Sequence, residues 1–126
     1  MAKWVHSDVL DQGPNFIKSN CNKIAVISAY TSGDSYATVN AAILAEAAMA
    51  SGDFTLASSG SNRTLTTASG KSDSSANATG TASHIAFVDT VNSKVLWVTS
   101  ETSGQSITSG NAVNFPALVY TANQPT

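Results

Sequence analysis

In the N-terminal segment, a histidine and an aspartate that could take part in catalysis or metal binding lie close together in the sequence. His6 and Asp8 lie two positions apart and share one face of an extended chain, close to Trp4. Together they could line a site, or bind a metal ion with ligands supplied from elsewhere in the chain. Two ligands at this spacing are a signal of low specificity, so a structural role is the better interpretation.

The second histidine has no acidic partner at a useful spacing. His84 and Asp89 lie five positions apart on an expected strand, and an odd separation points them to opposite faces. Asp8 and Asp11 would have to meet other carboxyl groups across a cleft to act in glycoside hydrolysis. We expect no enzymatic activity, no metal site and no cofactor. A small hydrolase or metal-binding enzyme that uses His6, Asp8 and His84 is the alternative.

Cys21 is the only cysteine of the chain. A single cysteine excludes an internal disulfide and any zinc site built on cysteine pairs. A lone cysteine is more often a small buried hydrophobic residue than a nucleophile.

Composition and charge exclude several classes of partner. The 126 residues suit one domain, charged residues make up only 11% of them, and 19 Ser and 14 Thr supply much of the polar surface. The net charge of −2 and the lack of a basic stripe argue against nucleic-acid binding.

No apolar run is long enough to cross a membrane, and the polar start is no signal peptide, which predicts synthesis in a cytoplasm. An uncharged surface of this kind suits an assembly, although a quirk of composition explains it equally well.

Short strands separated by Gly, Ser and Asn turns dominate the pattern. A hairpin is expected from strands at 83–90 and 95–99 with a turn near 91–94. Both arms are apolar on both faces, which predicts central strands covered on each side. Further strands are expected at 23–28, 53–57 and 63–67.

An Ala-rich stretch predicts one α-helix over about 35–50, capped by Asp34 or Ser35 and followed by Gly52. The expected fold is a single all-β domain over 1–126, an antiparallel β-sandwich, jelly-roll-like or a barrel, with this one α-helix inserted. The strand aromatics are expected in its core: Phe54, Phe87, Trp97 and Phe115.

Trp4 lies too close to the N-terminus to be buried by a strand. It either packs back onto the domain or anchors an N-terminal arm, residues 1–15, on another chain. The candidate contacts to a capsid or to another subunit are therefore Trp4, Val5, His6, Asp8, Val9 and Leu10.

Several stretches, in order and spacing, resemble small virion proteins encoded in the structural gene clusters of tailed bacteriophages. They span nearly the whole chain: 4–11, 17–21, 44–45, 51–56, 63–66, 80–89, 96–99, 106–111 and 115–117. The chain departs from the pattern at Gly13-Pro14 and in its Ser- and Ala-rich helical stretch.

The resemblance implies a capsid cement or decoration protein of the virion, made in the bacterial host cytoplasm and held on the capsid surface. Its implied partners are the major capsid protein and its own copies in a jelly-roll-like homotrimer, with no nucleic acid and no membrane. Three copies of each contact would combine modest affinities into high avidity. The alternative is a tail, neck or spike protein with a host-glycan contact.

Overall fold

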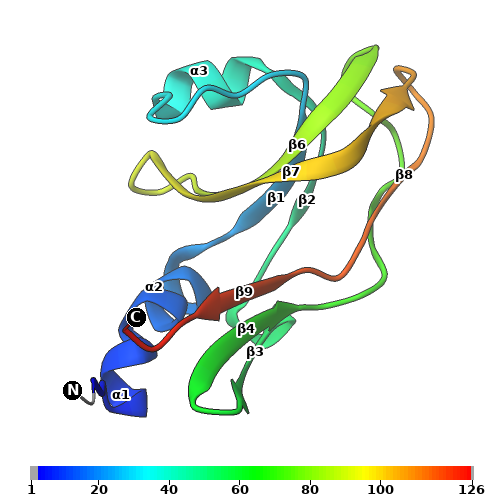
Figure 1. Cartoon of the computed structure of the whole chain (residues 1–126). Coiled ribbons are helices and arrows are strands. Elements are labelled where there is room, and N and C mark those ends of the chain that lie inside the picture. Colours follow the sequence, from blue (N-terminus) through cyan, green and yellow to red (C-terminus); the bar gives the residue numbers. More distant parts are fainter. Residues whose placement is uncertain (1–2, 126) are drawn as a thin grey trace.

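In the computed structural model, residues 3–125 are described, with the side chains of all of these except 102 and 103. The described chain is built mainly from antiparallel strands, with three short α-helices and one 3-10 turn (Figure 1). The elements are α1 (Ser7–Leu10), α2 (Gln12–Asn20), β1 (Lys23–Ile27), α3 (Tyr36–Ala41), β2 (Ile43–Ala48), η1 (Ser51–Asp53), β3 (Phe54–Ser59), β4 (Asn62–Thr67), β5 (Lys71–Asp73), β6 (Gly80–Asp89), β7 (Lys94–Ile107), β8 (Val113–Phe115) and β9 (Val119–Ala122).

The strands form three sheets, in which every pair of neighbours is antiparallel. The largest has the order β2-β1-β6-β7, the second has the order β3-β4-β9, and β5 pairs with β8. Figure 1 shows the four-stranded sheet above the β3-β4-β9 sheet, with α3 on the far side of the former. The all-β class with an inserted helix is confirmed.

The four-stranded sheet is apolar on both faces because successive side chains of a strand alternate between two cores. Ile24 and Val26 face the larger core, which also contains Leu65 of β4, whereas Ala25 and Ile27 face a smaller core beneath Val39 of α3. The hairpin is found where it was expected. The central position is confirmed for β6 but wrong for β7, which is the edge strand of its sheet.

The helix expected over 35–50 is wrong beyond its first turns. Ser35 does cap α3, because its Oγ accepts a hydrogen bond from the Thr38 amide at 3.2 Å. The helix ends at Ala41, and Ile43–Ala48 of the Ala-rich stretch forms β2, which pairs with β1 through Val26 and Ala45. Helix propensity is a weak preference, and the backbone pairing and burial of Ala45 outweigh it.

Candidate binding surface at the N-terminus

The N-terminal segment is fastened to its own domain at both of its ends. Val5 and Gln124 exchange two hydrogen bonds, of 2.9 Å from the Val5 amide to Oε1 and of 2.8 Å from Nε2 to the Val5 carbonyl. Asp11, between α1 and α2, forms an ion pair with Arg63 of β4 at 2.7 Å, and both side chains are largely buried. The segment that the sequence suggested as an arm therefore follows the domain surface.

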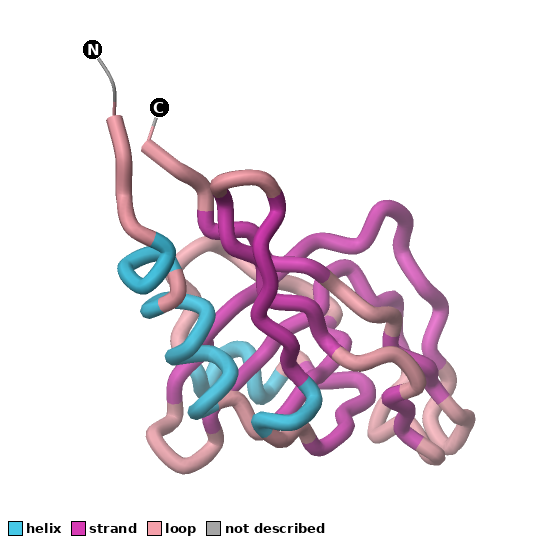
Figure 2. The backbone as a smooth tube through the Cα atoms, turned by 90° about the horizontal axis from the view of Figure 1, so that it is seen from below, coloured by secondary structure: helices cyan, strands magenta, loops and turns pink. Residues whose placement is uncertain are grey.

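Helix α2 is also held by its inner face. Pro14 and Ile17 are buried, and the Lys18 ammonium donates to the carbonyl oxygens of Ser51 and Phe54, each at 2.7 Å. Figure 2 shows α1 and α2 following each other along one side of the strands, close to the C-terminal end. Such anchoring fixes the outer face of the helices before any partner binds, which lowers the entropic cost of binding.

The outer face of this segment carries three large apolar side chains. Trp4 is 67% exposed, Val9 62% and Phe16 48%. Val9 lies on α1 and Phe16 on α2, and Asp11 alone separates the two helices in the sequence. We call Trp4, Val9 and Phe16 the N-terminal apolar surface.

The predicted contact residues differ in exposure. His6 and Asp8 are exposed beside Trp4 and Val9, whereas Val5 and Leu10 are half-buried. Phe16 was missed from the sequence, although its seven-residue spacing from Val9 is a signal that could have found it. A contact role for these residues stays a prediction.

The His6 ring caps the first turn of α1, because its Nδ1 accepts a hydrogen bond from the Asp8 amide at 3.1 Å. The same nitrogen lies 3.6 Å from the Asp8 carboxylate. Within residues 3–125, no three His, Cys, Asp or Glu side chains gather closely enough to hold a metal ion. The His6 ring and the Asp8 amide together cap the start of α1.

His84 and Asp89 have separate partners on β6. The His84 Nδ1 lies 2.7 Å from the Ser83 hydroxyl, and its ring packs against Tyr30. Asp89 is buried and accepts hydrogen bonds from the Asn92 side chain and amide, which keep its pKa below the usual range. This carboxylate holds the β6–β7 turn and does not orient His84.

Cys21 is buried directly after α2, and burial raises the pKa of its thiol to about 11. The thiolate is the reactive form, so the folded protein should resist thiol reagents at neutral pH. We expect labelling by iodoacetamide to be at least about a hundredfold slower in buffer than in denaturant, as followed by mass spectrometry. Equal rates in both conditions would contradict the buried position of Cys21.

Comparison of the chain with protein-family models, with curated proteins and with solved structures gives no significant match. Among the described residues, no helix is long and apolar enough to cross a membrane.

Proposed function

We propose that the protein is a bacteriophage capsid cement or decoration protein that binds across neighbouring major capsid protein subunits and stabilises the mature head. The observation that carries the proposal is the N-terminal apolar surface on an anchored helical segment. The resemblance of the sequence to small virion proteins of tailed phages supplies the kind of partner.

The physical chemistry of this surface supports binding to a protein. Exposed apolar side chains that gather on one segment are typical of protein interfaces, and Trp is the residue that most often dominates their affinity. The chain is also poor in charge, with 11% charged residues, so a contact would desolvate few ions. Binding to the assembled shell alone would stabilise the shell by linkage, and this needs no chemical reaction.

A homotrimer is part of the same proposal, because three copies of the surface around one axis would engage several capsid subunits at once. Light scattering on a sizing column at several concentrations measures the mass of the free protein. A mass of three chains supports the trimer, and a strict monomer contradicts preassembly of the trimer in solution.

The binding experiment uses purified full-length protein and heads of the encoding phage that lack it. A variant with Trp4→Ser, Val9→Ser and Phe16→Ser should bind about a hundredfold more weakly than the original protein in a co-sedimentation assay. The matched control is Val91→Ser with Val119→Ser, which removes two exposed apolar side chains elsewhere. This control should bind like the original chain.

Two results would overturn the proposal. Undiminished binding of the triple variant would exclude the N-terminal apolar surface as the contact. Failure of the original protein to bind heads, with attachment to tails instead, would favour the alternative of a tail, neck or spike protein.

A further inference from the structure

Strand β7 departs from regular pairing in its middle. His84 pairs with Ser100 and Ala82 with Gln105, so β7 advances by five residues where β6 advances by two. The three extra residues of β7 form a bulge that begins at Glu101. Such bulges occur next to binding and active sites, because they turn a side chain out of the regular alternation.

Gly104 closes the bulge by a close approach to β6. A Cβ atom at this position would lie 2.8 Å from Cγ2 of Thr81, closer than side chains tolerate. Any other residue at this position would make the Thr81 side chain move, and glycine avoids this clash where β7 returns to its partner.

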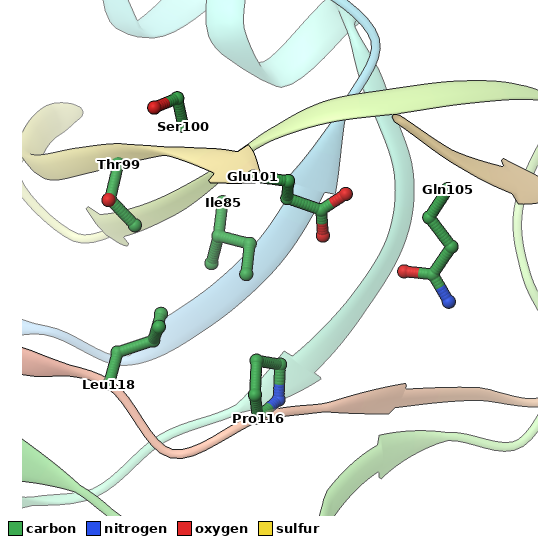
Figure 3. Close-up of a pocket in the computed structure, with 7 residues that line it drawn as sticks. All are labelled: Ile85, Thr99, Ser100, Glu101, Gln105, Pro116 and Leu118. Atoms are coloured by element: carbon green, nitrogen blue, oxygen red, sulfur yellow. The ribbon is translucent and has the colours of Figure 1, made fainter. Parts of the chain in front are cut away.

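An open pocket of about 350 Å³ lies beside the bulge, between β7 and the connection from β8 to β9. This volume is within the range of small-ligand sites. Ile85, Pro116 and Leu118 supply apolar walls, and Thr99, Glu101 and Gln105 supply polar groups. Figure 3 shows the Glu101 and Gln105 side chains on one side of this space, with Pro116 and Leu118 across from them.

Glu101 differs from the other described side-chain carboxyl groups because one of its oxygen atoms is buried without a hydrogen-bond partner. Its Oε2 is shut off from solvent and accepts no hydrogen bond from the described residues. The other seven carboxyl groups each have a hydrogen-bond or ion-pair partner within residues 3–125: Asp8, Asp11, Asp34, Glu46, Asp53, Asp73 and Asp89. A buried acceptor without a donor is costly, which indicates a missing partner.

The basic side chains from Lys18 onward have partners elsewhere. Lys18 binds backbone carbonyls, Lys94 lies over the Phe16 ring, and the other three form ion pairs: Lys23, Arg63 and Lys71. Within residues 3–125, the titratable side chain whose charge acts on Glu101 is His84 on β6. A counter-charge from outside the chain would fit the pocket.

We propose that the β7 bulge pocket binds a cationic group, an ammonium or a guanidinium, carried on an aliphatic stem. The Glu101 carboxylate would accept its N–H donors, and the Thr99 hydroxyl and the Gln105 side-chain carbonyl could accept others. The stem would lie against Ile85, Pro116 and Leu118. The cation has two possible sources, a free amine or guanidine and the Lys or Arg side chain of a protein partner.

The test titrates the full-length ¹⁵N-labelled protein with n-butylguanidinium and follows the amide resonances of Thr99, Glu101 and Gln105 by NMR. We expect saturable shifts at millimolar ligand. N-butylurea has the same shape without the charge, and it should bind about tenfold or more weakly. Absence of shifts with butylguanidinium, or equal affinity for the urea, would overturn the proposal.

Variants assign the binding to the carboxylate. Glu101→Gln should weaken butylguanidinium binding about tenfold or more, and Glu101→Asp should keep part of the affinity because it keeps the charge. Asp34→Asn is the matched control, since Asp34 lies in the loop before α3, on the other side of the four-stranded sheet, and this variant should bind like the original chain. Unchanged binding by Glu101→Gln would contradict the site.

The thermal stability of Glu101→Gln shows that the variant is folded and checks the unpaired charge independently. Burial raises the pKa of Glu101, which means that the folded protein binds the proton more tightly than the unfolded chain does. At pH values above the pKa of Glu101 in the folded protein, its buried charge therefore lowers the free energy of unfolding. This loss of stability disappears at pH values below the ordinary pKa of a glutamate. The variant should melt above the original protein at neutral pH and no longer do so at acidic pH; a lower melting temperature at neutral pH would contradict an unpaired charge.

Two further ligands separate the sources of the cation. Nα-acetyl-arginine N-methylamide presents the guanidinium as a protein side chain does, and spermidine presents a free amine. Binding of the blocked arginine with the affinity of butylguanidinium supports a side chain of a protein partner. Binding of spermidine and butylguanidinium without the blocked arginine supports a free small molecule. This site is separate from the N-terminal apolar surface, so either proposal can fail without the other.

Discussion

Phe87→Ala should lower the free energy of unfolding by about 3–5 kcal/mol, the usual cost of removing a fully buried aromatic side chain. Phe87 is completely buried on β6, and its ring stacks on Trp97 with 4.5 Å between centroids. The edge of Phe54 packs against the same ring at 6.3 Å. Loss of this ring therefore leaves a cavity between the four-stranded sheet and β3.

Urea denaturation at several protein concentrations measures the effect and separates folding from any association. Phe16→Ala is the matched control, because it is the same substitution at a half-exposed position, and it should change the free energy of unfolding by less than about 1 kcal/mol. A Phe87→Ala variant as stable as this control would show that the two sheets do not share the core described here.

Ile17→Ala should cost about 2–5 kcal/mol, the next largest effect. Ile17 is 6% exposed on α2 and belongs to the larger core together with Cys21, Phe54 and Leu65. The substitution removes the main apolar anchor between α2 and the strands. The same helix carries Phe16 on its outer side, so the stability of α2 determines whether the N-terminal apolar surface is held in place.

The matched control is Val9→Ala, an exposed apolar residue of α1. It should change the free energy of unfolding by less than about 0.5 kcal/mol in the same urea titration. If Ile17→Ala has as small an effect, α2 is not docked in solution, and the N-terminal segment is free to act as a contact arm on another chain, which is one of the two possibilities that the sequence left open.

The aromatic side chains show how far strand patterns in the sequence predict burial. Phe54, Phe87 and Phe115 are buried as expected, because each lies in a strand whose local pattern is apolar. Trp97 is only partly buried, since β7 is an edge strand, although its ring still covers Phe87 and contacts Tyr120. Which strand lies at a sheet edge depends on pairing between distant segments, and a local pattern does not contain this information.

The candidate sites also differ in how far the local sequence could predict them. Trp4 stands out in the sequence because it precedes every expected strand, and Val9 is one of the contact residues predicted beside it; both are exposed in the structure. Glu101 does not stand out, because a single Glu in a Ser- and Thr-rich stretch is typical of a solvated surface. Its significance arises from its place at the start of the bulge beside a pocket, where one of its oxygen atoms is buried without a hydrogen-bond partner.

The sequence by itself determined the all-β class and the β6–β7 hairpin, and it narrowed the helix cap to Asp34 or Ser35, because turns, caps and apolar patterns act over a few neighbouring residues. The burial of Cys21 was decided by the tertiary structure. The tertiary structure alone decided that residues 43–48 form a strand, that the N-terminal helices dock on the domain and that Glu101 lines a pocket. These features depend on long-range pairing and burial, whose free energies exceed the small differences in local propensity.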